Sequence, residues 1–537
     1  MSCIFRLTRL PAIVPLAFTL LSSGTASGQT PQPLRQPAPQ TTLAQRLSVD
    51  DVVRLALEQN LGLQVARLDP QVQDIAIAQV RSTWRPVFTS GLNRNSRNNA
   101  STSALDGGQG KVTDSVFSTQ FGLQQALRTG GSYSASWNNN RSTSTSSFTN
   151  FDPLLNASLR FDVSQPLLRD FKIDGARQQL ELGLKERDAS DLQLRSQIVL
   201  TTRNVKNAYW DLSYQIDNLK AVKQSLELAQ RVLSDNEKRV QVGTLAPIEL
   251  IEAQSEIARN EESVIVAEAA IQQAEDRLRS LIFDPTTPDF WSIDIEPTDT
   301  APFQAQALDV DAAVRRALDQ RTDVQLARNS LASSDISVRY YGNQVLPDVS
   351  AQFSYSSAAA GGTQLSPLNG IPIGETPVRS ILARRSYGSV LGDVLQGTFP
   401  TWAFGVSVSY PLGLSAQEAN LARAKVLYTR SLTEIKNLNM QVALDVRNVA
   451  RQVQTNQKRV DSTRVAREFA ERRLEAAEKK FNAGIETNFF VFQAQRDLTQ
   501  ARTGEVRAIS DYNRSLVDFE AVQQAPLGGG GSITTVR

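Results

Sequence analysis

An internal repeat restricts the fold of this chain more than any other feature of its sequence. The segment Leu47–Gln59 recurs as Leu308–Gln320, with most of its residues identical. The correspondence continues without a gap to a proline in each copy, Pro86 and Pro347. Self-similarity of this kind indicates two copies of one supersecondary unit rather than unrelated globular domains.

The N-terminus has the features of a secretory signal peptide. Arg6 and Arg9 precede an apolar run that is too short for a membrane-spanning helix, which needs about 20 apolar residues. Small residues follow up to Gly28, where we expect cleavage. The single cysteine, Cys3, lies before the apolar run, so we expect the exported protein not to be lipidated. The expected boundaries are 1–28 for the signal peptide, 29–46 for a disordered tail, 47–283 for the first repeat, 284–307 for an irregular linker, 308–524 for the second repeat and 525–537 for a second disordered tail.

The composition excludes many kinds of enzyme. The chain has no histidine, which excludes a Ser-His-Asp triad, a Cys-His pair and histidine-bound zinc. Its 57 Lys+Arg and 55 Asp+Glu nearly cancel, so charge gives no reason to expect a nucleic-acid partner. We expect no enzyme activity, no cofactor, and no catalytic or metal-binding residue.

Two long runs have the period of a coiled coil. Apolar residues of the first run recur at a mean spacing of about 3.5 residues, the heptad period, at Val205, Ala208, Leu212, Ile216, Leu219, Val222, Leu226, Ala229 and Leu233. The run extends over residues 176–241, and a matching one over 417–482, which predicts helices roughly 100 Å long. Helices of that length need partners along their whole course. An earlier helix is expected from its N-cap Ser48 to a point before Pro86.

The period changes to two between the paired prolines, at 86–166 and 347–411. Apolar side chains alternate with small or polar ones at Phe117–Leu127, Tyr133–Trp137, Leu155–Val163, Val349–Tyr355 and Trp402–Tyr410. The serine-, asparagine- and glycine-rich stretches 93–111, 138–150 and 357–369 are expected to be loops. A soluble sandwich shows the same alternation. The aromatic residues, the signal peptide and the polar loops instead favour transmembrane strands.

Such strands cannot close a barrel within one chain. Unpaired backbone groups cost several kcal/mol each in lipid, and the smallest transmembrane barrels have about eight strands. The sequence predicts four to six strands per chain. Several copies must therefore share one barrel.

These motifs resemble the TolC-like outer-membrane efflux proteins. The resemblance rests on the repeat, on Ala208–Asp211, on Ser164–Leu168 and on the Gly…Ala-Gln elements that begin at Gly243 and Gly484. It implies an α+β membrane protein: a homotrimeric transmembrane β-barrel in outer-membrane lipid, continued by a long coiled-coil α-helical barrel in the periplasm. It also implies a passive exit duct of a tripartite efflux or type I secretion system, fed by an inner-membrane pump through a periplasmic adaptor. The prolines at the strand–helix junctions would be Pro86, Pro166, Pro347 and Pro411.

The resemblance places the periplasmic tip at two helix–turn–helix elements. The residues expected there, as the adaptor-docking surface, are Gly243, Thr244, Pro247, Glu249, Gly484 and Ile485. Each glycine suits a left-handed residue at a helix C-terminus. Pro247 suits the first turn of the following helix.

The expected pore constriction comprises Asn488, Phe490 and Gln493. Members of the family often carry an acidic residue six positions after the second glycine, and sometimes another at nine; here these positions are Phe490 and Gln493. Three copies of Phe490 would form an apolar ring that gates by dewetting. The alternative is that Phe490 packs against the neighbouring helix. In the first repeat, Glu249 and Glu252 take the equivalent positions.

The first repeat also contains an additional predicted hairpin. Strands at Val116–Leu127 and Ser132–Trp137 flank a Gly-Gly turn suited to reversing the chain. This predicts six strands per chain and eighteen per trimer; the alternative is a twelve-stranded barrel with the hairpin packed on or inside it. A short extracellular helix is expected within 376–396.

Two other functions remain open from the sequence. A periplasmic adaptor (membrane fusion protein) would show one helical hairpin, small β-domains and an anchor, whereas this sequence duplicates a strand–helix pattern. A structural surface coiled coil would not need the strand-ending prolines. The cargo, the cognate pump and the choice between efflux and protein secretion stay open.

Overall fold

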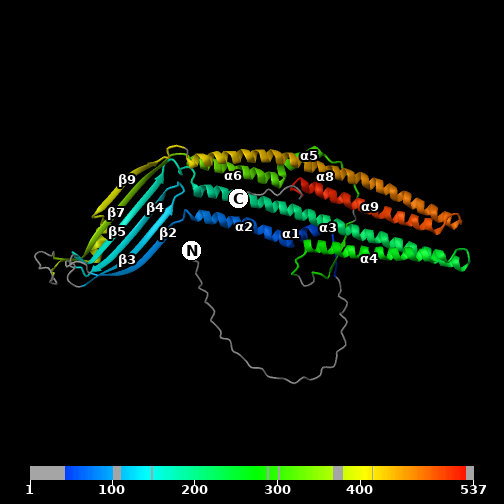
Figure 1. Cartoon of the computed structure of the whole chain (residues 1–537), viewed down its shortest axis with the longest axis horizontal. Helices are drawn as coiled ribbons and strands as arrows, with labels where there is room; N and C mark the ends of the chain where they lie inside the picture. Colours follow the sequence, from blue (N-terminus) through cyan, green and yellow to red (C-terminus); the bar gives the residue numbers. More distant parts are fainter. Residues whose placement is uncertain are drawn as a thin grey trace, which may run out of the picture. The chain divides into compact units, whose positions relative to one another are not determined.

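The computed structural model describes residues 43–100, 110–146, 149–286, 290–299, 303–366, 379–413 and 415–527. The expected signal peptide and the larger parts of both expected tails lie outside these residues. Residues 44–537 form one unit. Within it the strands of a sheet lie at one end, and long helices run from there to two hairpin turns (Figure 1).

Two helical hairpins make up most of the chain. The first consists of α3 (Gly175–Gln241) and α4 (Ile248–Ile282), and the second of α8 (Ala416–Asn482) and α9 (Asn488–Val522). Asp174 caps α3 by accepting the amide of Arg177 at 2.7 Å, and Ser415 and Glu418 form a capping box at the start of α8. The predicted long helices are thus confirmed to within one residue. The apolar seam of α3 is buried or half-buried throughout.

The single helix expected before Pro86 is wrong, because the chain forms two. α1 (Val49–Gln59) and α2 (Leu61–Ser82) are separated at Asn60, whose ψ of 117° is extended. The Asn60 side chain accepts the amide of Leu63 at 3.0 Å and donates to the Leu281 carbonyl at 3.0 Å, which fixes the break. Ser48 is the N-cap as predicted, and Asp51 completes a capping box with it.

The second repeat has the same break at Arg321, between α5 (Val310–Gln320) and α6 (Thr322–Gln344). Arg321 is buried and forms ion pairs with Asp323 and Asp445, both at 3.0 Å. The buried guanidinium group of Arg321 therefore has carboxylate partners on α6 and on α8, which compensate for the loss of solvation.

A two-stranded sheet corrects the expected boundaries of the linker and the first tail. β1 (Leu43–Leu47) pairs with β6 (Ile293–Pro297), so the end of the expected N-terminal tail and part of the expected linker are ordered together. Buried Tyr209 donates to the Leu47 carbonyl at 3.2 Å and thereby joins β1 to α3. Short strands of this kind have too few residues to show an alternating pattern.

In the larger sheet, the strands lie in the order β2-β3-β4-β5-β7. β8 and β9 pair with different parts of β7 and together occupy the sixth strand position of this sheet. Its strands are β2 (Val87–Ala100), β3 (Lys111–Ala126), β4 (Ser132–Ser144), β5 (Phe151–Pro166), β7 (Asp348–Leu365), β8 (Ile381–Arg385) and β9 (Pro400–Ser409). All pairs are antiparallel. The predicted hairpin is confirmed as β3–β4. It is part of the sheet between β2 and β5, not packed on a face of it.

Parts of the three stretches expected to be loops are instead strand. β2 continues to Ala100, β4 to Ser144 and β7 to Leu365, through sequences rich in serine, asparagine and glycine. Backbone hydrogen bonds to paired neighbours hold these strands, so they do not depend on an apolar face. The strands are therefore longer than the apolar alternation predicts.

The two faces of the sheet differ in chemistry. In an antiparallel sheet, directly opposed residues share a face. One row joins Leu123, Ala135, Phe161, Tyr355 and Trp402, and we call this side the apolar face. The adjacent row on the opposite side, the polar face, joins Gln124, Ser134, Asp162, Ser354 and Ala403.

A short helix, α7 (Tyr387–Gln396), covers part of the apolar face. Its buried Val390 and Val394 pack against Ala157 of β5 and Ala359 of β7. The helix expected within 376–396 is therefore present at 387–396, but residues 381–385 of that stretch are strand β8, and 376–378 lie outside the described residues. No helix in the described ranges combines the length and the apolar character needed to cross a membrane.

Candidate functional site

The α3–α4 turn is built as its glycine predicts. Gly243 has a φ of +81°, and its amide donates to the Val240 carbonyl at 3.0 Å. The amide of Thr244 donates to the Arg239 carbonyl at 2.9 Å. These two bonds are a Schellman motif, which satisfies carbonyls that a helix end leaves unpaired. Pro247 lies directly before α4 with a helical φ of −58°.

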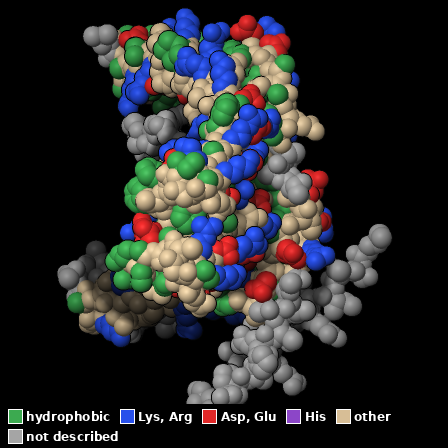
Figure 2. All heavy atoms as spheres, turned by 90° about the vertical axis from the view of Figure 1, so that its right-hand side faces the viewer, with side chains coloured by type: hydrophobic (Ala, Val, Ile, Leu, Met, Phe, Trp, Pro, Cys, Tyr) green, Lys and Arg blue, Asp and Glu red, His purple; other side chains and the backbone are tan. Residues whose placement is uncertain are grey.

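The α8–α9 turn repeats this geometry. Gly484 has a φ of +74° and donates to the Phe481 carbonyl at 3.0 Å, and Ile485 donates to the Lys480 carbonyl at 2.9 Å. Ile485 is 73% exposed. The end of the unit that carries both turns faces the reader in Figure 2, where hydrophobic, basic and acidic side chains are mixed over the surface.

Replacing Gly484 with alanine is expected to lower the free energy of unfolding by about 1–2 kcal/mol, the usual cost of a left-handed conformation with a Cβ atom. A Cβ atom there would meet nothing within 4 Å, so the cost is purely conformational. Gly504 provides the matched control, because it lies inside α9 and its Cβ position is also open. Gly504→Ala is expected to stabilise the protein by about 0.5–1 kcal/mol. Urea unfolding of the full-length protein, followed by circular dichroism, measures the free energy of unfolding of both variants. If both substitutions changed this free energy in the same direction, the left-handed role assigned to Gly484 would be contradicted.

The three residues expected at the constriction have different environments. Asn488 is fully buried, whereas Phe490 is 51% exposed. The Phe490 ring makes an edge-to-face contact with Phe489, at 5.7 Å between centroids. Gln493 donates to Asp497 at 2.9 Å and accepts from Arg496 at 2.9 Å, so its side chain is held along α9. Of the three, Phe490 alone offers a large exposed apolar group.

A pair of buried amides lies between the hairpins, and sequence patterns did not reveal it. Thr499 of α9 donates to Ser225 of α3 at 2.9 Å, which sets the register of these antiparallel helices. Asn236 and Asn488 lie the same distance from this contact, about three helical turns along each helix, and so lie at the same level of the two helices. Both are fully buried, and within the described residues neither amide group has a hydrogen-bond partner. Unpaired buried amides cost about 1–3 kcal/mol each, so these two side chains destabilise the packing near the turns.

An ion pair joins the hairpins between Asn488 and Thr499, about two turns along α9 from Asn488. Glu256 of α4, only 6% exposed, accepts a hydrogen bond from Arg496 of α9 at 2.9 Å. Arg259 lies 3.6 Å from the same carboxylate. Nothing in the local pattern distinguishes Glu256 from the surface acids around it, because its burial depends on α9.

Glu249 also has an unusual environment, at the start of α4. Burial raises the pKa of its carboxyl group, and repulsion from Glu252 raises it further. One carboxylate oxygen of Glu249 is buried without a hydrogen-bond partner among the described residues. The side chain is therefore less well solvated than an ordinary surface glutamate.

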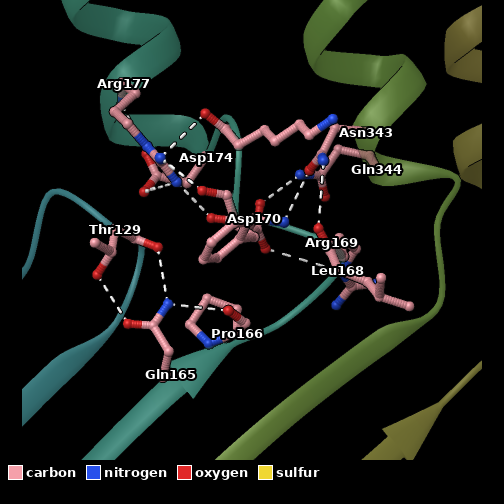
Figure 3. A network of polar contacts seen from close by, with 12 residues as sticks. Thr129, Gln165, Pro166, Leu168, Arg169, Asp170, Asp174, Arg177, Asn343 and Gln344 are labelled. Carbon is pink, nitrogen blue, oxygen red and sulfur yellow. Dashed lines mark hydrogen bonds and ion pairs between the residues drawn. The ribbon is translucent and has the colours of Figure 1, made fainter.

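The four prolines lie at the ends of strands, and Figure 3 shows the polar network next to one of them, Pro166. Pro86 and Pro347 directly precede β2 and β7, Pro166 ends β5, and Pro411 follows β9. Asp170 follows Pro166 in a left-handed conformation, with a φ of +65°.

Contacts from two helices hold Asp170 in that conformation. Its amide donates to Asn343 of α6 at 2.8 Å, and its side chain accepts from Gln344. Its carbonyl accepts from Arg177 of α3. The β3–β4 turn also packs here, because a Cβ atom at Gly130 would lie 2.2 Å from the Asp170 carbonyl oxygen. The additional hairpin is thus fitted to the junction.

The polar face of the sheet forms a hollow next to the junctions, of about 630 Å³. Its lining includes Gln124, Ser134, Asp162 and Gln352 from four strands. Arg160 and Asp162 form an ion pair at 2.9 Å within it. No three acidic or cysteine side chains of the described residues come together as a metal site would require. The hollow is suited to water and polar solutes.

Unpaired sheet edges, one apolar face and long paired helices together define a class of protein, an outer-membrane channel subunit. The outer membrane efflux protein family matches residues 52–282 and 313–522, and the chain belongs to this family. It is an outer-membrane exit duct of efflux systems. The family and the fold are those of channels rather than of enzymes.

Relatives and solved structures agree with this assignment. The pyoverdine export outer membrane protein OpmQ of Pseudomonas putida is 25% identical over 419 residues, which cover 76% of this chain and 77% of OpmQ. The CmeC channel of Campylobacter jejuni has a TM-score of 0.60 at 16% identity, covering 89% of this chain and 85% of CmeC. VceC of Vibrio cholerae has the same TM-score and identity, covering 89% and 97%. The open-state MtrE channel of Neisseria gonorrhoeae gives a TM-score of 0.59 at 15% identity, covering 89% of each. These likenesses are to the whole fold, sheet and helices together.

Proposed function

We propose that three copies of this chain form a closed duct. The main support for this proposal is the structure of the two lateral edges of the subunit. Among the described elements, the helices near the sheet contact one another in the order α2-α3-α6-α8, and those near the turns in the order α4-α3-α9-α8. The sheet runs from β2 to β9. One edge of the subunit is therefore β2, α2 and α4, and the other is β9 and α8.

The α2 edge carries an apolar stripe with heptad spacing. Its members are 45–71% exposed and are Leu61, Val65, Leu68, Val72 and Ile75. Spacings of four and three residues are those of a coiled-coil seam that lacks its partner helix. The opposite edge offers exposed apolar residues on α8, among them Val426, Met440 and Leu444. An edge that fits the opposite edge of another copy generates a ring.

The same pairing closes the sheet. β2 and β9 each leave one side unpaired within the described chain, and lipid does not tolerate such edges. Six strand positions per subunit give eighteen in a trimer. The apolar face then contacts lipid and the polar face lines the lumen.

The tips formed by the two hairpin turns are the proposed contact with a periplasmic adaptor and, through it, an inner-membrane pump. Support comes from the matched Schellman motifs, which present Thr244 and Ile485 at equivalent places on the two hairpins. The docking surface would comprise Gly243, Thr244, Pro247, Glu249, Gly484 and Ile485. The domain boundaries, 47–283 and 308–524, belong to the same proposal, with one hairpin in each repeat. Phe490 would form the apolar constriction just inside the tips.

The proposed cargo is a small molecule rather than a secreted polypeptide. OpmQ, which aligns with three quarters of this chain, is named for the export of pyoverdine. Export of a siderophore or a comparable polar compound fits a lumen lined by the polar face, which carries amide, hydroxyl and charged side chains. The signal peptide expected at 1–28 would bring the chain to the outer membrane.

The full-length purified protein tests the duct directly. We expect it to migrate as a heat-modifiable trimer, to fractionate with the outer membrane and to conduct ions in planar bilayers. Cysteines introduced at Thr244 and Ile485 should crosslink an adaptor in cells, whereas one introduced at exposed Lys111, on the sheet, should not. A protein that stays monomeric in detergent and carries no current would overturn the proposal.

A further inference from the structure

Two exposed arginines lie on the apolar face of the sheet, at the end remote from the helices. Arg94 of β2 is directly opposed to Phe117 of β3, and Phe117 is directly opposed to Arg141 of β4. The three side chains therefore share one face. Neighbouring strands lie about 4.8 Å apart, so the backbones of the two arginines, two strands apart, are separated by about 10 Å.

This row marks the border of the apolar surface. Toward the helices, the same face carries Leu92, Phe121 and Phe88, which are 72%, 42% and 67% exposed. Away from the helices, the next row is Ser96 and Ser115. The arginines thus lie where apolar side chains give way to small polar ones. In the proposed orientation that border is the outer interface of the membrane.

The two positive charges are not paired with a carboxylate among the described residues. Asp114 of β3 and Asp162 of β5 lie on the polar face, and Asp152, at the irregular start of β5, forms no ion pair with either arginine. Neither Arg94 nor Arg141 has an ion-pair partner within the described part of the chain. The acidic residue of α7, Asp393, is already paired with Arg385.

We propose that Arg94 and Arg141 together bind the phosphate group of a lipid in the outer leaflet, with Phe117 against its acyl chains. This inference rests on the proposed function, because it needs the apolar face to contact lipid. A guanidinium presents a planar fork of donors that matches phosphate oxygens. An uncompensated arginine would be unfavourable against hydrocarbon, whereas at the interface a lipid phosphate supplies both counterion and acceptor.

Lipid binding by the purified trimer tests the proposal, with diphosphorylated lipid A as the probe and native mass spectrometry as the readout. Each of Arg94→Gln and Arg141→Gln is expected to weaken binding about fivefold, and the double variant about 25-fold, the factors expected for arginines near an anionic surface. Arg97→Gln is the matched control, because Arg97 lies on the same strand but on the polar face. It should leave binding unchanged.

Two further arms identify the ligand. Dephosphorylated lipid A should bind the unaltered trimer as weakly as the double variant binds the phosphorylated form. Inorganic phosphate should compete poorly, since a lipid is also held by its chains; effective competition would point to free phosphate and overturn the proposal. Equal binding of lipid A by the double variant and by Arg97→Gln, with trimers and conductance intact, would also overturn it. Loss of the trimer and its conductance in the unaltered protein would instead overturn the proposed function.

Discussion

Replacing Leu68 and Val72 of α2 with aspartate is expected to convert the trimer into monomers. Both side chains belong to the exposed stripe that we assign to contact with α8 of the next subunit. Burying each is worth about 2 kcal/mol, so losing both weakens an interface by about 4 kcal/mol, or about a thousandfold in its dissociation constant. Placing carboxylates against an apolar partner adds a further penalty. Light scattering in detergent measures the mass directly.

Ala78→Asp provides the control for that substitution. Ala78 is exposed on the same helix but lies off the stripe. It should leave the trimer intact, which separates a specific loss of contact from a general effect of charge on α2. A trimer that survives the double substitution with unchanged mass would mean that the stripe faces water.

The second large effect is expected at Phe490, where serine should open the duct. In the proposed trimer, three copies of exposed Phe490 would form an apolar ring that excludes water, and serine would replace it with a wetted constriction. We expect single-channel conductance to rise at least about tenfold, the factor that corresponds to about 1.4 kcal/mol of barrier. Phe490→Leu should keep the channel closed, because it preserves an apolar group.

Phe489 provides the matched control for this measurement. It is 48% exposed, almost as much as Phe490, and lies next to it in α9. Consecutive residues of a helix point about 100° apart, so the two rings cannot both face one axis. Equal conductance changes for Phe489→Ser and Phe490→Ser would show that bulk at the turn, rather than a ring at one position, controls the current.

The sequence predicts the elements of this fold well, because their signals are periodic and local. Spacings of 3.5 residues locate α3 and α8 to within a residue, and the Gly-Gly turn locates the β3–β4 hairpin. Polar strand ends such as Asn138–Ser144 carry no such period. Their structure comes from pairing with β3 and β5, which the sequence does not display.

Contacts between helices were harder to predict from the sequence than the helices themselves. Asn236 and Asn488 look like ordinary polar residues until the packing of the helices buries both of them. Glu256 looks like a surface acid until Arg496 covers it. Each depends on contacts between segments more than two hundred residues apart, for which one sequence contains no direct signal. The glycines of the turns, by contrast, were identifiable because a left-handed residue after a helix is a local requirement.

The six strand positions have a consequence for where cargo is sorted. The diameter of a barrel grows roughly linearly with its number of strands, so eighteen give a mouth about one and a half times as wide as twelve. Phe490 and the two hairpin turns lie at the opposite end of helices that span roughly 100 Å. Molecules would therefore be selected by size at a narrow throat deep in the periplasm, and released through an exit too wide to hold them back.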